Sequence, residues 1–124
     1  MKKKILVVDD EAGITRMIKL NLERTGKYDV LTENEGSKAV AAARQFKPDM
    51  IFLDVMMPDK SGDEIAADLK EDAELGDTPF VFLTAIVTKD EAEQSGGEIA
   101  GNTFLAKPVK TEELLQTIER FLGT

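Results

Sequence analysis

Five short apolar runs recur along the chain, and stretches of helix-like pattern separate them. The runs cover residues 5–8, 29–32, 50–53, 80–83 and 103–106. Several are continuous in apolar residues instead of alternating with polar ones, which is typical of parallel strands covered on both faces. Strands that alternate with helices at this spacing are joined by right-handed parallel crossovers. The pattern therefore predicts one α/β domain of (βα)5 type, with a doubly wound, five-stranded parallel sheet.

Helical spacing of apolar residues marks four stretches, each with one face that we expect to pack against the sheet. The inward-facing residues are Ile14, Met17, Ile18 and Leu22 in the first stretch, Ala39, Val40 and Ala43 in the second, Gly62, Ile65, Ala66 and Leu69 in the third, and Leu115, Ile118 and Leu122 in the last. Gly26 and Gly123 are placed to close the first and last helices, and Thr111 to cap the start of the last. A further stretch, 88–95, is polar and runs into two glycines, so we expect only a short or frayed helix there.

Polar side chains follow four of the five runs, at the point where each strand is predicted to end. They are Asp9 and Asp10 after the first run, Asp54 after the third, Thr84 after the fourth and Lys107 after the fifth. Because the carboxyl ends of parallel strands share one edge of a sheet, these side chains are expected to converge there. The second run ends in Thr32 and Glu33 with no comparable pattern, which is consistent with an outer strand away from the site.

Three carboxylates this close repel one another unless positive charge intervenes, and Lys107 alone leaves them undercompensated. A site made of acidic oxygens suits Mg²⁺, which takes few protein ligands and keeps several waters, and Mn²⁺ could substitute. A carboxylate beside Mg²⁺, a hydroxyl and a lysine suits phosphoryl transfer. The carboxylate attacks phosphorus, while the metal and the lysine neutralise charge on the equatorial oxygens.

Composition narrows the functional classes further. The chain has 124 residues, one domain's worth, with 42% apolar and 32% charged residues. It contains no cysteine and no histidine, which excludes disulfides, thiol or histidine catalytic pairs, and thiolate or imidazole metal sites. The net charge of −8 argues against direct nucleic-acid binding. No apolar run approaches a membrane span of about 20 residues, and the N-terminal run is too short for a signal peptide, so we expect a cytoplasmic protein.

Four fragments in register give the chain a family resemblance. ILVVDDE, FLDVMMPDKSG, FLTA and FLAKP, in this order and spacing, resemble the receiver domains of bacterial two-component response regulators, the CheY-like superfamily. The likeness covers nearly the whole chain. It implies a flavodoxin-like strand order of 2-1-3-4-5, and a single receiver domain over residues 1–124 with no effector domain present.

The resemblance also implies roles for the polar residues. Asp54 accepts a phosphoryl group from a phosphohistidine on a sensor histidine kinase or a histidine phosphotransfer protein. Mg²⁺ is bound by Asp10, Asp54 and the backbone carbonyl of Met56, with Asp9 acting largely through water. Lys107 pairs with the phosphoryl group, and Thr84 donates its hydroxyl to it.

Further features follow from the same likeness. Pro58 and Gly62 match the loop after the acceptor strand, and the Lys107–Pro108 peptide bond is expected to be cis. Thr84 and Phe104 are expected to form a conformational switch that changes the surface of the fourth helix, fifth strand and fifth helix. This surface would act on a downstream protein target or a missing effector domain.

Two sets of positions bear on phosphate lifetime and on assembly. Met56 and Ile86 flank the site, and because neither can orient an attacking water, we expect a long-lived phosphorylated state. Receivers that dimerise to drive DNA-binding domains carry an acidic pair where Asn102 and Thr103 stand here, which weakens the case for that dimer. We expect a monomer or a weak phosphorylation-dependent dimer, with no nucleic acid or membrane among its partners.

Three other functions compete with this interpretation. A pseudo-receiver, an interaction module that is never phosphorylated, predicts a damaged acidic pocket, and this pocket is intact. A phosphatase of the haloacid dehalogenase type requires Asp-x-Asp after the first strand, where the chain has Asp9, Asp10 and Glu11. A flavodoxin-like flavin binder requires a phosphate-cradling loop there. As a receiver, the chain would be no enzyme beyond assisting its own phosphorylation and slow loss of the phosphate.

Overall fold

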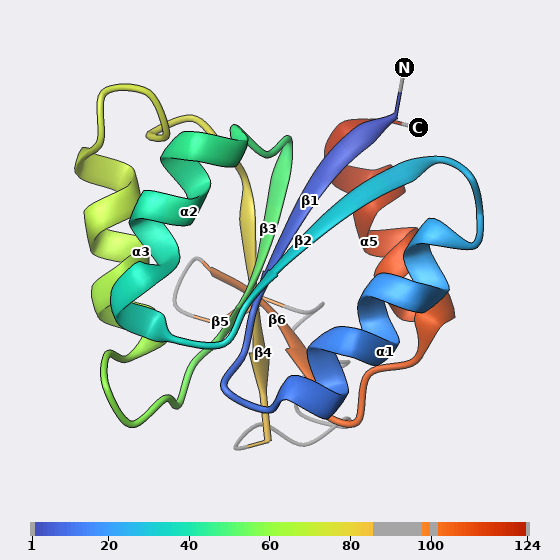
Figure 1. Cartoon of the computed structure of the whole chain (residues 1–124), viewed down its shortest axis with the longest axis horizontal. Coiled ribbons are helices and arrows are strands. Elements are labelled where there is room, and N and C mark those ends of the chain that lie inside the picture. The colour runs from blue at the N-terminus through green and yellow to red at the C-terminus, as the bar shows by residue number, and fades with distance from the viewer. Residues whose placement is uncertain (1, 86–97, 100–101, 124) are drawn as a thin grey trace.

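A computed structural model describes residues 2–85, 98–99 and 102–123. Five strands run parallel in one sheet, β1 (Lys3–Val8), β2 (Tyr28–Glu33), β3 (Met50–Asp54), β4 (Phe80–Thr84) and β6 (Asn102–Ala106), in the order β2-β1-β3-β4-β6 (Figure 1). The predicted parallel sheet and the strand order 2-1-3-4-5 are confirmed. The structure adds β5 (Glu98–Ile99), which pairs antiparallel with β6 at the outer edge. Two residues are too few to leave a hydrophobic pattern, so this strand was not predicted.

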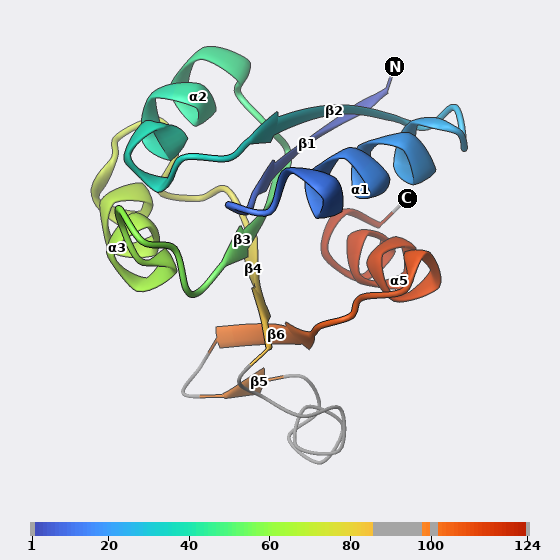
Figure 2. The same cartoon turned by 60° about the horizontal axis from the view of Figure 1, so that its bottom comes forward.

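Helices cover both faces of the sheet (Figures 1 and 2). α1 (Ala12–Glu23) and α5 (Thr111–Leu122) lie on one face. α2 (Ala39–Phe46), which follows a 3-10 turn (Gly36–Lys38), and α3 (Gly62–Glu71) lie on the other. No helix in the described part of the chain is long and apolar enough to cross a membrane. The expected helix over residues 88–95 lies outside the described residues.

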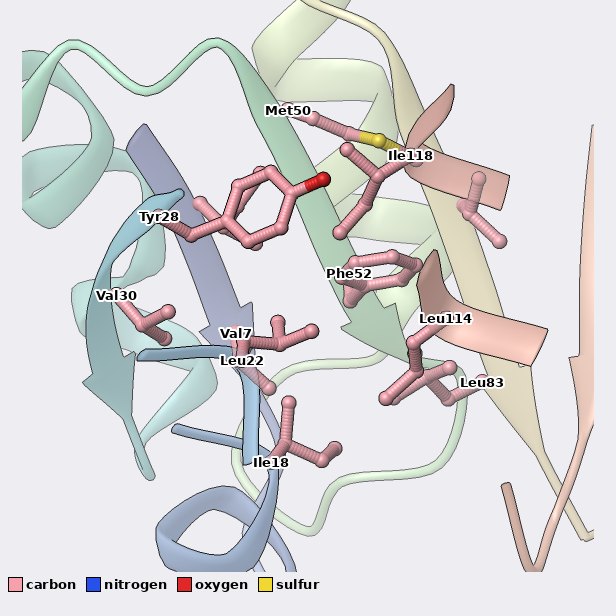
Figure 3. Close-up of a cluster of buried hydrophobic side chains, with 12 residues drawn as sticks. Val7, Ile18, Leu22, Tyr28, Val30, Met50, Phe52, Leu83, Leu114 and Ile118 are labelled. Carbon is pink, nitrogen blue, oxygen red and sulfur yellow. The ribbon is translucent and has the colours of Figure 1, made fainter. Parts of the chain in front are cut away.

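The continuous apolar runs are buried because both faces of the sheet are covered, as the sequence predicts. All five residues of β3 are buried. On the α1 and α5 face the core consists of large side chains, among them Val7, Ile18, Leu22, Phe52, Leu114 and Ile118 (Figure 3). On the α2 and α3 face it includes the small residues Ala39, Ala43 and Ala66, together with larger residues of the central strands.

The predicted helix faces are correct with two exceptions. Met17 was expected to face inward but is 50% exposed, because Ile14, Ile18 and Leu22 already fill the face that meets the sheet. In α5 the most deeply buried leucine is Leu114, which the prediction omitted, while the predicted residues Leu115 and Leu122 are only partly buried.

Two predicted caps are displaced. α1 ends at Glu23 with a right-handed C-cap at Arg24, and Gly26, with φ of 78°, lies in the turn that follows. The N-cap of α5 is Lys110, and Thr111 is the first helical residue instead of the cap. The prediction that Gly123 closes α5 is confirmed, since it is the C-cap and has a left-handed backbone with φ of 70°. The N-cap of α3 is Ser61, whose hydroxyl accepts a hydrogen bond from the Glu64 N–H.

The outer edge of β2 is partly closed by α1. Backbone groups of the odd-numbered residues of β2 face β1, since Lys3 and Asp9 donate to the carbonyls of Lys27 and Glu33. Val30 therefore points its N–H and C=O away from the sheet. The Glu23 carboxylate accepts from the Val30 N–H at 3.1 Å, and Lys19 Nζ donates to the Val30 carbonyl at 2.6 Å.

Candidate functional site

Three carboxylates meet at the carboxyl edge of the sheet. Asp9 follows β1, Asp10 comes next, and Asp54 is the last residue of β3, so the pairing of β1 with β3 brings them together. One oxygen from each lies within 4.8 Å of the others. Asp9 is fully buried, Asp54 is 4% exposed and Asp10 is exposed. A hollow of about 260 Å³ opens beside this acidic trio, lined by Asp10, Glu11, Asp54, Met56, Thr84, Ala85 and Lys107.

Lys107 faces the trio from the end of β6. Its Nζ lies 2.7 Å from Asp9 Oδ2, 3.3 Å from Asp54 Oδ1 and 3.5 Å from Glu11 Oε1. Its backbone N–H donates to the Thr84 carbonyl at 2.9 Å, which ties the end of β6 to that of β4. The Lys107–Pro108 bond is cis, as the resemblance implies. A single ammonium is therefore shared among several carboxylates.

Burial and crowding shift the protonation of the two buried partners. Burial, together with the nearby Asp9 charge, raises the pKa of Asp54 to about 6, although Lys107 acts in the opposite direction. For Lys107, burial acts to lower the pKa, but the combined attraction of Asp9 and Asp54 outweighs it, so the pKa is raised. Lys107 thus stays protonated at neutral pH, and Asp54 is mostly ionised there.

The donor set fits a small divalent cation. Asp9 Oδ2 is buried and makes no hydrogen bond within the described part of the chain, and its cationic neighbour is the Lys107 ammonium. Asp9 Oδ1 accepts from the Glu11 N–H at 3.0 Å. Three oxygen donors around an undercompensated negative charge suit Mg²⁺ or Mn²⁺ in preference to softer metals. Met56 N–H approaches Asp54 Oδ1 at 3.4 Å, so the Met56 backbone borders the same space.

The two predicted switch residues lie on neighbouring strands. Thr84 is buried at the end of β4 and lines the hollow. Phe104 is half-buried on β6, where its ring stacks on Phe82 with centroids 5.0 Å apart. Thr103 is buried, and Ile86 lies outside the described residues. The structure thus brings Asp9, Asp10, Asp54, Met56, Thr84 and Lys107 together at one edge.

The loop after β3 is shaped by a glycine. A Cβ on Gly62 would lie 2.4 Å from the Asp54 carbonyl oxygen and 2.9 Å from Val55 Cα, so any side chain there would displace the end of β3. The Gly62 N–H donates to the Val55 carbonyl at 2.8 Å, which closes the loop. This contact is the physical reason for Gly62 in the matched motif.

Two polar residues near the site were not identified from the sequence. The Asn34 side chain donates to the Asp9 carbonyl at 2.8 Å, and the Asp59 carboxylate accepts from the N–H groups of Gly36 and Ser37. Each contact joins segments more than 20 residues apart. In the sequence, Asn34 and Asp59 are simply polar residues in predicted loops, and such residues are common in any surface turn.

Comparison with known proteins agrees with this geometry. Residues 5–119 match the family model of the response regulator receiver domain. The chain is 39% identical to the alkaline phosphatase synthesis transcriptional regulatory protein PhoP of Bacillus subtilis, over 98% of this chain and 49% of PhoP. It is 30% identical to the polar-differentiation response regulator DivK of Brucella anthropi, over 99% of this chain and 98% of DivK. The chain thus spans about half the length of PhoP but nearly all of DivK.

Solved structures give the same result. The chemotaxis protein CheY4 of Vibrio cholerae superposes with a TM-score of 0.82 at 34% identity, over 98% of this chain and all of the other. The range matched by the family model, residues 5–119, includes the acidic trio and Lys107. The chain therefore belongs to the family of response regulator receiver domains.

Proposed function

We propose that this receiver domain is switched by transfer of a phosphoryl group to Asp54 from a phosphohistidine on a sensor histidine kinase or a histidine phosphotransfer protein. One observation carries the proposal: a buried carboxylate lies 3.3 Å from a lysine ammonium, beside two further acids, in the lining of a hollow of about 260 Å³. An ordinary structural ion pair requires neither the extra acids nor the hollow.

The transfer needs a nucleophile, a place for developing charge and an open approach. An Asp54 oxygen attacks phosphorus, a P–O bond forms and the P–N bond breaks, and the electron pair leaves with the imidazole nitrogen. Lys107 neutralises charge on the phosphoryl oxygens, and the Thr84 hydroxyl donates to one of them. Asp54 does not need a separate base, because with a pKa of about 6 it is already mostly ionised at neutral pH.

The acidic trio would hold the metal that such a transfer requires. Asp10, Asp54 and the Met56 carbonyl are the proposed Mg²⁺ ligands, with Asp9 acting through water, and Mn²⁺ could replace Mg²⁺. When bound, the ion supplies positive charge to the phosphoryl oxygens. The crowding of three carboxylates around a single lysine ammonium supports this assignment.

The output is a shift between two surfaces. Thr84 moves toward the phosphoryl group, and Phe104 turns into the space that Thr84 leaves, which changes the surface of the fourth helix, the fifth parallel strand (β6) and α5. The fourth helix falls outside the described residues. A downstream protein or an effector domain responds to this change, and the reaction takes place in the cytoplasm. The domain itself binds no nucleic acid, consistent with its net charge of −8.

The alternative functions are less consistent with the family membership and with the site. Membership in the receiver family removes the dehalogenase-type phosphatase and the flavin binder. A pseudo-receiver would have no need for a buried Asp54 that contacts Lys107 in the lining of a hollow, so the phosphorylated switch is the better account.

The test is incubation of the protein with Mg²⁺ and a small phosphodonor such as acetyl phosphate, followed by intact-mass spectrometry. We expect a gain of one phosphoryl group, dependent on Mg²⁺ and absent from Asp54→Ala. Glu71→Ala, which removes an exposed acid from the end of α3, is the matched control and should be phosphorylated like the wild type. A wild-type protein that gains no phosphoryl group, or an Asp54→Ala protein that does, would refute the proposal.

A further inference from the structure

A short segment after β2 contacts both loops that carry the acidic trio, although it contributes no member of the trio. This bridging segment, residues 33–37, runs from the end of β2 into the 3-10 turn. One of the two loops, between β1 and α1, carries Asp9 and Asp10. The other, between β3 and α3, follows Asp54 and includes Met56. The two loops are the halves of the proposed metal site.

On the Asp9 side, the bridging segment holds the backbone from both directions. The Asp9 N–H donates to the Glu33 carbonyl at 3.1 Å, and the Asn34 amide donates to the Asp9 carbonyl at 2.8 Å. The same amide donates to Thr15 Oγ1 at 3.0 Å, and Thr15 is buried in α1. Asn34 therefore fixes the peptide between Asp9 and Asp10 against the first turns of α1.

On the Asp54 side, the bridging segment holds the loop through Asp59. The Asp59 carboxylate accepts from the Gly36 N–H at 3.2 Å and from the Ser37 N–H at 2.9 Å. These hydrogen bonds, that from the Ser37 N–H first, lower the pKa of Asp59, so its charge persists throughout the physiological range. The backbones approach closely, because a Cβ on Gly36 would lie 2.6 Å from the Lys60 carbonyl oxygen.

Such anchors are needed because the trio repels itself. Carboxylates within 4.8 Å of one another push the two loops apart whenever the metal is absent. Metal binding is tightest when ligands are already held at their bound spacing, and partners behind the ligands are what hold them. The bridging segment hydrogen-bonds to both loops through its own residues.

We propose that residues 33–37 act as a clamp that sets the spacing between the two halves of the metal site, with Asn34 and Asp59 as positioning residues. The proposal rests on the proposed function, because it concerns the same Mg²⁺ site. Neither residue touches the metal or the phosphoryl group. Their effect passes through the backbones of Asp9 and of the loop after Asp54.

The first measurement is Mg²⁺ affinity by isothermal titration calorimetry, with no phosphodonor present. Asn34→Ala and Asp59→Asn should each raise the dissociation constant about three- to tenfold, the usual effect of losing one or two supporting hydrogen bonds. Glu35→Gln and Asp63→Asn are matched controls that remove exposed charge from the bridging segment and from the first turn of α3, and both should bind like the wild type. Leu75→Ala, a buried substitution in the connection between α3 and β4, lowers stability without touching the clamp and should also leave the affinity unchanged.

The second measurement separates the clamp from the proposed function. In metal-free protein, amide hydrogen exchange should speed up across the clamp: at the Glu11 N–H in Asp59→Asn, and at the Gly62 N–H in Asn34→Ala. Exchange confined to the mutated side, or affinity equal to that of the controls, overturns the clamp. If the wild type took up neither Mg²⁺ nor a phosphoryl group, the proposed function would fail, and the exchange data alone would still decide whether residues 33–37 join the two loops.

Discussion

The acidic residues of the site and Lys107, here called the acid half and the lysine half, are held in place by different forces. Asp9 and Asp54 carry like charges that repel, and backbone hydrogen bonds and a close glycine contact keep them where they are. Lys107 is held by attraction, through ion pairs of 2.7 and 3.3 Å, with a backbone tie to Thr84. The acid half therefore depends on geometry and the lysine half on charge, and substitutions in the two halves should fail in different ways.

Removal of the lysine charge is the largest change that the comparison predicts. Lys107→Met leaves Asp9 buried with no cation beside it, and losing one partner of a buried pair costs about 3 kcal/mol. Urea denaturation at pH 7.5 should show this loss, and uptake of a phosphoryl group should fall sharply. At pH 5 part of the stability should return, because Asp54 is then protonated. Lys27→Met, an exposed lysine, should change stability by less than about 0.5 kcal/mol, and an equal loss in both variants would contradict the charge argument.

A methyl group tests the geometry of the acid half without changing charge. In Gly62→Ala the new Cβ meets the Asp54 carbonyl at 2.4 Å, and we expect a loss of about 2 kcal/mol with weaker Mg²⁺ binding. In Gly13→Ala the Cβ meets nothing within 4 Å inside α1, and we expect a gain of about 0.5–1 kcal/mol. Thermal unfolding of the pair, with calorimetry of Mg²⁺ binding, measures both effects. Equal stability of the two variants would show that the strand end yields to the added group.

Removal of one repelling charge should stabilise the acid half at neutral pH. The pKa of Asp54 is raised to about 6, against about 3.9 in an unfolded chain, so the stabilising contribution of its proton is complete below pH 4 and lost as the pH rises through 6. Asp54→Asn should therefore gain about 1–2 kcal/mol at pH 7.5, after allowance for solvent screening, and nothing at pH 4. Asp63→Asn is the control, and denaturation at the two pH values is the measurement. A gain of the same size at both would contradict the pKa argument.

The smallest effect concerns the border between the two halves. Met56 lines the hollow with a side chain that is 64% exposed and has no group to orient water. Met56→Asn should shorten the life of the phosphorylated state by a few-fold, as followed by loss of the phosphoryl mass over time. Met17→Asn replaces a second exposed methionine, which lies on α1 away from the site, and should leave the lifetime of the phosphorylated state unchanged. Faster loss from the wild type than from Met56→Asn would count against this role.

The site residues could be predicted because parallel strands convert order in the sequence into a common edge. Asp9, Asp54 and Lys107 each follow a continuous apolar run, so their convergence required only that the runs be parallel strands. The same reasoning could not find Asn34 and Asp59. Each acts through a contact with a loop more than 20 residues away, and the apolar pattern carries no information about how loops meet.

The helix errors have a different cause. Met17 and Leu114 were misjudged because spacing defines a stripe about 100° wide or more, and the sheet decides which part of the stripe is buried. At the start of α5, Thr111 was a reasonable cap by residue type, yet the backbone is already helical there and extended at Lys110. Residue preferences locate helix ends only to within a residue or two.

The cover that Lys19 and Glu23 place on β2 has a consequence for the protein at high concentration. A strand from another molecule could pair with β2 only by displacing Lys19 and Glu23 from the Val30 backbone. The two charged side chains would then lie next to the backbone of the incoming strand. Growth of the sheet from copy to copy, the route by which exposed edges lead to ribbons and precipitates, is thus opposed at the middle of this edge. Even at high protein concentration, the β2 edge of this domain therefore resists edge-to-edge pairing between copies.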